Sequence, residues 1–87
     1  MFYVYMLKSV KDKTTYIGCT GDLRKRFEEH NQGKTRSLKS KLPLQLVYYE
    51  AYLDKGVARK REIELKKNSF RKKELFKRLF LPPSSRG

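Results

Sequence analysis

The sequence predicts a mixed α/β (α+β) fold in which a three-stranded antiparallel sheet is flanked by helices, in the order β-β-α-β-α-α. Two β-rich runs separated by a short polar stretch open the chain, which is typical of a hairpin. Further on, helical periodicity alternates with a single β-rich run. With 87 residues the chain can form one small domain, too small to enclose a large substrate. Any functional site is therefore expected on an open face.

The predicted hairpin contains the first two strands. Residues 2–8 form a continuous aromatic and β-branched run, and residues 14–20 are again rich in β-forming side chains. Polar residues 9–13 connect the two runs. Because paired strands place facing side chains close together, the hairpin can bring Tyr5 near Tyr16.

The first helix is predicted between a capping residue and a glycine. Thr20 or Asp22 can cap its amino end with a side-chain oxygen, and the helix then runs to Gln32. Gly33 follows, in the position where helices commonly end with a left-handed residue. The apolar face of this helix carries Leu23, Phe27 and His30.

A basic stretch at residues 34–41 is expected to form a loop that leads into the third strand, which is predicted at residues 44–52. Asp54 then caps a second helix that extends to about Lys67.

A third helix is predicted to begin at a Ser69 cap. Its apolar stripe consists of Leu75, Phe76, Leu79 and Phe80. Two consecutive prolines end the helix. Residues 1–81 are therefore predicted to form the domain, and residues 82–87 a flexible tail.

The chain is strongly basic, with 22 Lys and Arg residues against 9 Asp and Glu residues, and a formal charge of +13. Because 38% of the residues are hydrophobic, a core can form, and the charge is not that of a disordered tail. Such a charge predicts a polyanionic partner, either nucleic acid or an anionic membrane surface. The apolar run at the amino terminus is too short to span a bilayer or to serve as a secretory core, so a cytoplasmic protein is expected.

The metal-binding options are limited by composition. The single cysteine cannot form an internal disulfide, and one cysteine with one histidine cannot supply a structural zinc site. Any metal ion would be held by oxygen atoms.

Charged residues on two predicted helices are unusual for a purely structural role. Glu62 falls on the inward face of the second helix, where a carboxylate needs a partner. It is either a rim carboxylate paired with Arg59 or Lys66, or a ligand of a divalent metal ion. Arg26 and His30 stand four residues apart on the first helix, so the guanidinium and the imidazole lie on the same face of the helix and close together. They are either a solvated arginine and a hydrogen-bonded boundary histidine, or parts of one site.

The hairpin tyrosines also allow two interpretations. Tyr3 and Tyr5 share one face of the first strand, and Tyr16 shares a face of the second strand with Gly18. Aromatic residues in strands usually serve the core. The alternative is that these tyrosines line a site.

The order of these residues carries a family resemblance. The pattern consists of Tyr3-Val4-Tyr5, Tyr16-Ile17-Gly18, Arg26, His30 and Glu62. This arrangement closely resembles the GIY-YIG nuclease superfamily over about residues 1–80. It looks most like the small stand-alone members related to the amino-terminal nuclease domain of excinuclease C. The resemblance implies the superfamily's three-stranded antiparallel sheet flanked by helices, in agreement with the element order above.

Two positions depart from the superfamily pattern. Tyr3 replaces the glycine of the first motif, and Cys19 stands where excinuclease-type members carry a lysine, three residues after the motif tyrosine. Without that lysine, Arg26, His30 and a metal ion are the groups that could help to deprotonate a tyrosine. No separate DNA-binding domain is apparent, so structure-directed or weakly sequence-selective cutting is expected.

The resemblance implies a metal-dependent endonuclease that hydrolyses phosphodiester bonds of DNA, with a role in DNA repair. It implies a tyrosine as the base, Arg26 on the scissile phosphate, His30 as a helper, and Glu62 as the ligand of a single, weakly held Mg²⁺ or Mn²⁺. Either Tyr5 or Tyr16 could be the base; we assign Tyr5 to this role and Tyr16 to a positioning or partner role. A free tyrosine is a poor base at neutral pH, so nearby positive charge must favour its phenolate.

Further basic residues are expected to hold the nucleic-acid backbone, which we expect to be DNA rather than RNA. They are Lys34, Arg36, Lys39, Lys41, Arg71 and Lys72. A solubilising role is the alternative for each of them. A monomer without membrane contact is expected.

Two other functional classes stay open. One is a non-catalytic nucleic-acid-binding module on the same fold. The other is a basic protein-interaction domain, which explains the charge but not the set of tyrosine, arginine, histidine and glutamate.

Overall fold

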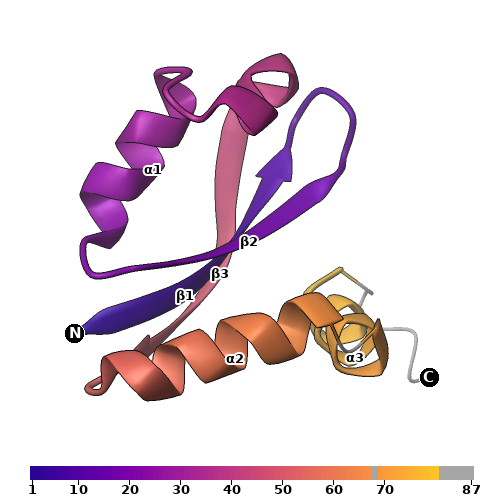
Figure 1. Cartoon of the computed structure of the whole chain (residues 1–87). Coiled ribbons are helices and arrows are strands. Elements are labelled where there is room, and N and C mark those ends of the chain that lie inside the picture. The colour runs from indigo at the N-terminus through magenta and orange to yellow at the C-terminus, as the bar shows by residue number, and fades with distance from the viewer. Residues whose placement is uncertain (68, 81–87) are drawn as a thin grey trace.

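The computed structural model describes residues 1–67 and 69–80 of the chain. In order, its elements are β1 (Phe2–Ser9), β2 (Thr15–Thr20), α1 (Leu23–Asn31), the 3-10 helix η1 (Arg36–Lys41), β3 (Leu44–Tyr52), α2 (Lys55–Lys67) and α3 (Ser69–Phe80) (Figure 1). This order confirms the predicted fold class and the arrangement β-β-α-β-α-α. The predicted tail, residues 82–87, lies outside the described part of the chain.

The sheet is antiparallel with the strand order β2-β1-β3, so that β1 is central and β2 and β3 form the edges. Tyr5 on β1 lies opposite Gly18 on β2 and Tyr49 on β3. The pairing with β3 shifts by one residue between Met6 and Leu7. The predicted hairpin is therefore present, and it places the first-strand tyrosine directly beside the glycine of the second strand.

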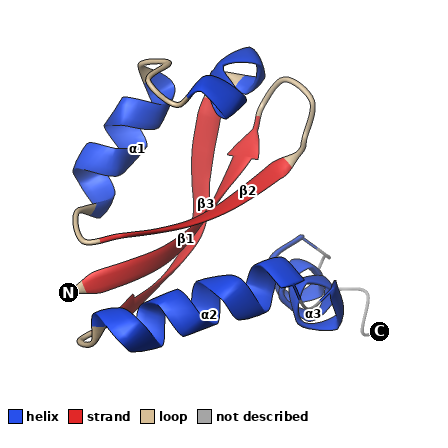
Figure 2. Ribbon diagram, in the orientation of Figure 1, coloured by secondary structure: helices blue, strands red, loops and turns tan. Residues whose placement is uncertain are grey.

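The helices cover opposite faces of the sheet, with α1 on one side and α2 with α3 on the other (Figure 2). Alternation along β1 divides its side chains between two apolar clusters. The cluster under α1 consists of Tyr5, Leu7, Leu38 and Leu44, with Tyr16, Leu23, Phe27 and Leu42 packed against it. The cluster under α2 and α3 consists of Val4, Met6, Ile17, Ala58, Leu65 and Leu75.

The ends of α1 follow the sequence signals. Of the two predicted capping residues, Asp22 is the N-cap, and its side chain accepts a hydrogen bond of 3.1 Å from the backbone N–H of Lys25. Thr20 instead donates its hydroxyl to the backbone carbonyl of Asp22 at 3.3 Å. Beyond the helix, Gly33 has a φ of 79°, the left-handed conformation that glycine adopts without steric cost. The chain turns sharply there and returns along the sheet.

A cluster around Glu50 connects α2 to β3. The Glu50 carboxylate accepts two hydrogen bonds of 2.9 Å from the guanidinium of Arg61, together with the hydroxyls of Tyr48 and Tyr52. Burial raises the pKa of Glu50, but these hydrogen bonds outweigh burial and hold it at about 2. Since Arg61 immediately precedes Glu62, the cluster sets the rotation of α2 and the direction in which Glu62 points.

Two local expectations need correction. The basic stretch before the third strand is not an open loop, because residues 36–41 form η1, whose Leu38 is buried in the α1 cluster. Ser69 is the first residue of α3 rather than a residue that precedes it. Within the described residues, no helix combines the length and the apolar character needed to cross a bilayer.

Candidate active site

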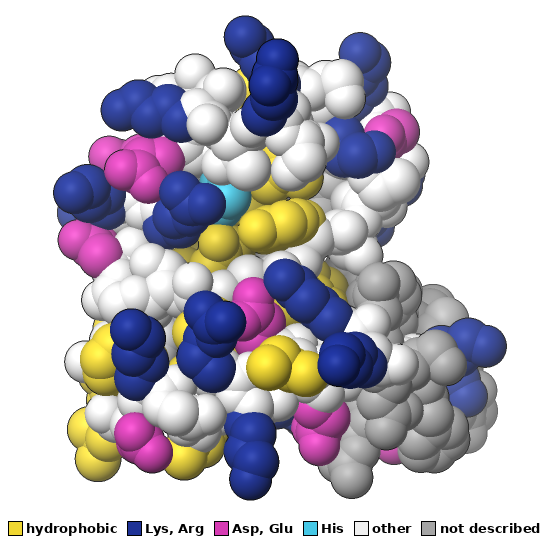
Figure 3. Space-filling view, in the orientation of Figure 1, with side chains coloured by type: hydrophobic (Ala, Val, Ile, Leu, Met, Phe, Trp, Pro, Cys, Tyr) yellow, Lys and Arg dark blue, Asp and Glu magenta, His cyan; other side chains and the backbone are white. Residues whose placement is uncertain are grey.

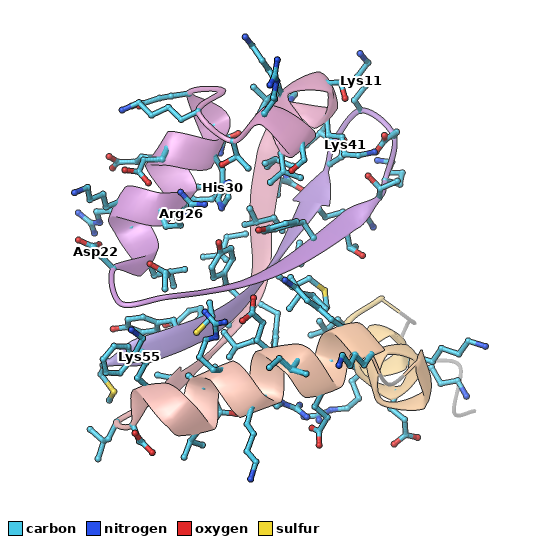
Figure 4. All side chains as sticks on the ribbon, viewed as in Figure 1. Lys11, Asp22, Arg26, His30, Lys41 and Lys55 are labelled. Carbon is cyan, nitrogen blue, oxygen red and sulfur yellow. The ribbon has the colours of Figure 1, made fainter. Side chains whose placement is uncertain are left out.

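The predicted tyrosine, arginine, histidine and glutamate residues lie about the edge strand β2, with Arg26 and His30 on α1 at one face of the sheet and Glu62 on α2 at the other. Arg26 and His30 point from α1 toward the sheet (Figure 4). Figure 3 shows the same face, on which basic side chains surround a hollow between the two helices that also contains an acidic side chain. Four elements from different parts of the sequence, β1, β2, α1 and α2, therefore contribute residues to the site.

Tyr5 lies at the centre of this arrangement. Its side chain is 2% exposed, and its hydroxyl is 2.8 Å from Nε2 of His30. Burial raises the pKa of Tyr5 to about 12, and Tyr16 and Glu62 add to this rise, whereas the nearby guanidinium of Arg26 opposes it. Tyr5 therefore keeps its proton at neutral pH unless a further cation or a proton acceptor assists.

Gly18 leaves the space that the Tyr5 hydroxyl occupies. A Cβ atom on Gly18 would stand 2.4 Å from the hydroxyl oxygen and 2.6 Å from the adjoining ring carbon of Tyr5. It would also be 3.1 Å from the ring of Tyr16. No larger residue fits here without moving Tyr5, so this glycine is needed for close approach.

Tyr16 stands beside the same histidine. Its ring centroid lies 5.4 Å from that of His30 and 6.4 Å from that of Tyr5, which confirms that the hairpin brings the two tyrosines together. The ammonium of Lys66 on α2 lies 5.8 Å from the centroid of the Tyr16 ring. Tyr16 therefore joins the α1 side of the site to the α2 side.

His30 is fully buried and is bonded at both ring nitrogens. Nε2 contacts the Tyr5 hydroxyl, and Nδ1 lies 2.7 Å from the hydroxyl of Thr35. Burial lowers the pKa of His30, and the charge of Arg26 lowers it further, so the neutral ring predominates near pH 7. A neutral ring donates from one nitrogen and accepts at the other. When Nδ1–H donates to Thr35, Nε2 is free to accept the proton of Tyr5.

Arg26 is the most accessible cation next to Tyr5. Its guanidinium forms an ion pair of 3.2 Å with Glu29, and its side chain is 40% exposed. It also lies close enough to Tyr5 to oppose the rise in the pKa of that hydroxyl. An arginine that is held at one edge and open at another suits a bound phosphate.

Glu62 reaches this surface from the opposite side of the sheet. Its side chain is 13% exposed and pairs with Lys66 at 3.0 Å and with Arg59 at 3.7 Å. Both partners are those expected for a rim carboxylate. The negative charge of Glu62 nevertheless reaches Tyr5, whose pKa it helps to raise. Glu62 is thus a paired carboxylate and a neighbour of the tyrosine site at the same time.

A comparison with known proteins identifies the family of the chain. Residues 1–75 match the family described as the GIY-YIG catalytic domain. The chain belongs to the GIY-YIG family.

Named relatives in the GIY-YIG family are small proteins of similar length. The chain is 42% identical over 74 residues to a UPF0213 protein of Streptococcus pyogenes serotype M3, which covers 84% of this chain and 79% of the relative. It is 40% identical, over the same shares of both chains, to a UPF0213 protein of Streptococcus pyogenes serotype M5. The solution NMR structure of the UPF0213 protein BH0048 from Bacillus halodurans is 36% identical, with a TM-score of 0.56, and the match covers 97% of this chain and 90% of that chain.

The GIY-YIG family has nuclease-like catalytic domains that typically use a divalent metal ion. Among the described residues no three His, Cys, Asp or Glu side chains gather into a metal-binding group. Glu62 alone offers a hard carboxylate oxygen, which suits Mg²⁺ because this ion keeps several waters and accepts phosphate oxygens as further ligands. The residues therefore fit one weakly held ion that is shared with substrate, and not an ion enclosed by protein.

Both departures from the GIY-YIG pattern have visible consequences. Tyr3 packs edge-on against Tyr49, with ring centroids 6.0 Å apart, and the two line a groove of about 480 Å³ between α1 and β3. Cys19 is partly buried, and burial raises the pKa of its thiol. Glu62 raises this pKa further, whereas Arg59, Lys55 and Lys66 lower it. The place of the missing lysine is therefore close to Glu62 and to the cations of α2.

The basic segment (Lys34, Arg36, Lys39 and Lys41) adjoins the site through Thr35, which binds His30. Of these, Lys34, Arg36 and Lys39 are exposed. Lys41 instead pairs with Asp12 of the hairpin at 3.0 Å. The side chains of the other two predicted contacts, Arg71 and Lys72, lie outside the described part of the structure.

Two contacts were missing from the sequence-based prediction of the site. Thr35 had no signal, because its approach to His30 depends on the turn at Gly33. Lys66 did have a signal, since it follows Glu62 by four residues on a helix. That spacing was assigned only to a possible ion pair and not to the tyrosines.

Proposed function

We propose that this chain is a metal-dependent endonuclease that hydrolyses phosphodiester bonds of DNA, either structure-directed or weakly sequence-selective. The observation that carries the proposal is the hydrogen-bonded series from Tyr5 to His30 to Thr35, with the Arg26 cation close enough to act on the tyrosine. A buried tyrosine in a purely structural core needs one partner for its hydroxyl. This tyrosine has a proton acceptor on one side and an exposed cation on the other.

The hydrogen bonds have one orientation that serves hydrolysis. The Tyr5 hydroxyl donates to Nε2 of His30, and Nδ1–H of His30 donates to Thr35, while the nearby Arg26 charge favours the Tyr5 phenolate. In this orientation the Tyr5 proton can pass to neutral His30. The phenolate oxygen, stabilised by the charge of Arg26, then accepts a proton from the attacking water.

The other site residues complete the reaction. The open edge of the Arg26 guanidinium binds a non-bridging phosphate oxygen and stabilises the charge that develops in the transition state. Tyr16 positions the substrate beside the same histidine. A divalent ion bound to Glu62 would supply positive charge at the leaving 3′-oxygen.

The basic segment supports DNA as the substrate. Its exposed lysine and arginine side chains contact phosphates, which position the backbone but carry no base information. Weak sequence selectivity follows from that kind of contact.

The test uses purified protein and a panel of single-stranded, duplex and forked DNA, with Mg²⁺ or Mn²⁺. Glu62→Gln should abolish metal-dependent cleavage while DNA binding stays intact or becomes tighter, because a negative charge beside phosphate has been removed. Arg26→Ala should lower the cleavage rate about a hundredfold, the usual cost of removing one preorganised donor. Lys67→Met, on an exposed position of α2, serves as the control for the change in charge.

The outcomes separate an enzyme from a binding module. Cleavage that is unchanged in both site variants would come from a contaminant or from another site, and would rule this one out. Salt-sensitive DNA binding without cleavage by the wild type on any DNA or RNA tested would identify a non-catalytic nucleic-acid-binding module.

A further inference from the structure

Lys66 contacts two parts of the candidate site at once. It follows Glu62 by one turn of α2, and its ammonium donates a hydrogen bond of 3.0 Å to Oε2 of that carboxylate. The same ammonium lies 5.8 Å from the centroid of the Tyr16 ring. An ordinary helical ion pair would involve the carboxylate alone. This lysine also faces one of the two tyrosines.

The contact with Lys66 stands where a metal ion would bind. The Glu62 side chain is only 13% exposed, and a carboxylate so far removed from water needs a cationic partner. A divalent ion on the same oxygen would place two like charges side by side. The ammonium and the ion therefore compete for Oε2 of the carboxylate.

We propose that Lys66 occupies the metal position on Glu62 in the metal-free protein and transfers to a substrate phosphate when the ion binds. This inference rests on the proposed function, since it assigns the metal to Glu62. Lysine suits the exchange because its ammonium is a compact charge with three donors on a flexible stem. The Lys66 side chain is 47% exposed, so it has room to turn away from Glu62.

The departure at Cys19 supports the assignment. The charges of both Glu62 and Lys66 act on the Cys19 thiol, so the lysine ammonium lies near the position on β2 where excinuclease-type relatives carry their own lysine. In this chain the cation that β2 lacks is supplied by Lys66 on α2, from the other side of the edge strand. Arg59 differs from Lys66 in its geometry, because it lies 3.7 Å from Glu62 and is 61% exposed.

The first experiment measures Mn²⁺ binding in the absence of nucleic acid, by calorimetry or by the electron paramagnetic resonance signal of free Mn²⁺. Lys66→Met should bind Mn²⁺ more tightly than the wild type by roughly 5- to 150-fold, the usual range of coupling between two sites. Lys67→Met removes the same charge from the neighbouring, exposed position and should leave the affinity unchanged. Glu62→Gln should abolish binding, and Lys66→Gln repeats the test should the methionine variant unfold.

The second experiment measures DNA binding without metal or cleavage. Glu62→Gln frees Lys66 for phosphate, so its affinity for a single-stranded oligonucleotide should exceed that of the Glu62→Gln/Lys66→Met double variant. The Glu62→Gln/Lys67→Met variant controls for net charge and should bind more tightly than the double variant that lacks Lys66. Equal affinity in these two double variants would show that Lys66 makes no special phosphate contact, and would overturn that half of the proposal.

The metal experiment also distinguishes failure of this inference from failure of the proposed function. Equal Mn²⁺ affinity in the wild type and in Lys66→Met, with binding abolished in Glu62→Gln, overturns the exchange and leaves the metal on Glu62. If no variant shows Mn²⁺ binding that depends on Glu62, the metal has no place in the proposed function. The exchange of Lys66 for the ion on Glu62 is then overturned as well.

Discussion

Replacing Gly18 with alanine tests whether the position of the Tyr5 hydroxyl matters for the chemistry. The added methyl group would stand 2.4 Å from the hydroxyl oxygen, a separation that Cβ atoms do not show in folded proteins. Tyr5 is buried, and its hydroxyl is bonded to His30, so the ring has no free space into which it can swing. The hydroxyl must therefore shift while the rest of the fold stays in place.

The size of the effect follows from that overlap. An ordinary carbon–oxygen contact requires a displacement of about 1 Å, and a misplacement of that size typically costs on the order of a hundredfold in rate. We therefore expect kcat to fall about a hundredfold, which corresponds to about 2.7 kcal/mol of transition-state stabilisation. Crowding of a packed core should also lower the free energy of unfolding by about 1–3 kcal/mol. KM should change little, because the phosphate contacts of Arg26 and the basic segment remain.

The assay compares steady-state cleavage and urea unfolding for the wild type, Gly18→Ala and Gly21→Ala. Gly21 is the matched control, since a Cβ atom there would lie 3.7 Å from the Phe2 ring, an ordinary contact. Both substitutions remove the same backbone freedom, but only one displaces Tyr5. Wild-type turnover by Gly18→Ala, with the Tyr5–His30 contact retained in its structure, would refute the role assigned to the Tyr5 hydroxyl.

Further predictions concern stability, pH and salt. The folded-state pKa of Glu50 is about 2, below its ordinary 4.5, so the ionised carboxylate contributes roughly 3 kcal/mol to the free energy of unfolding. This contribution is present above pH 4.5 and disappears as the pH falls toward 2. In urea unfolding, the stability of Glu50→Gln should not show this decrease at acidic pH. Parallel pH profiles of stability for the wild type and Glu50→Gln would contradict the prediction. Cleavage should fall as the pH drops below 6.5 through the lowered pKa of His30, because protonated Nε2 cannot accept from Tyr5, and a rate that is flat over this range would exclude His30 as the acceptor. Neutralising the basic segment should reduce the slope of log affinity against log salt by about 0.9 for each phosphate of duplex DNA that the protein no longer neutralises, and an unchanged slope would place those contacts elsewhere.

The fold was largely predictable because its signals are local. Alternation in the first two runs, the capping oxygen of Asp22 and the left-handed residue Gly33 each act within a few positions of the chain. The meeting of Tyr5 with Tyr16 was predictable for the same reason, since a short hairpin leaves little freedom of register.

The remaining contacts depend on packing between distant elements. Thr35 reaches His30 only because the chain reverses after α1, and no residue type signals that contact in advance. The orientation of Glu62 depends on the rotation of α2, which is set by the hydrogen bonds between Arg61 and Glu50 on β3. Sequence could identify Glu62 as an inward carboxylate but could not show which tyrosine its charge would reach.

The arrangement of layers explains why the site lies at β2. The helix that carries Arg26 and His30 covers one face of the sheet, and the helix that carries Glu62 covers the other, so their side chains can meet only across an edge strand. At that edge Gly18 leaves room for the tyrosine hydroxyl. A substrate phosphate placed there can contact groups from both helices without entering the core. The proposed phosphodiester chemistry therefore requires no enclosed cavity, and it depends on α2 keeping Glu62 beside the edge strand.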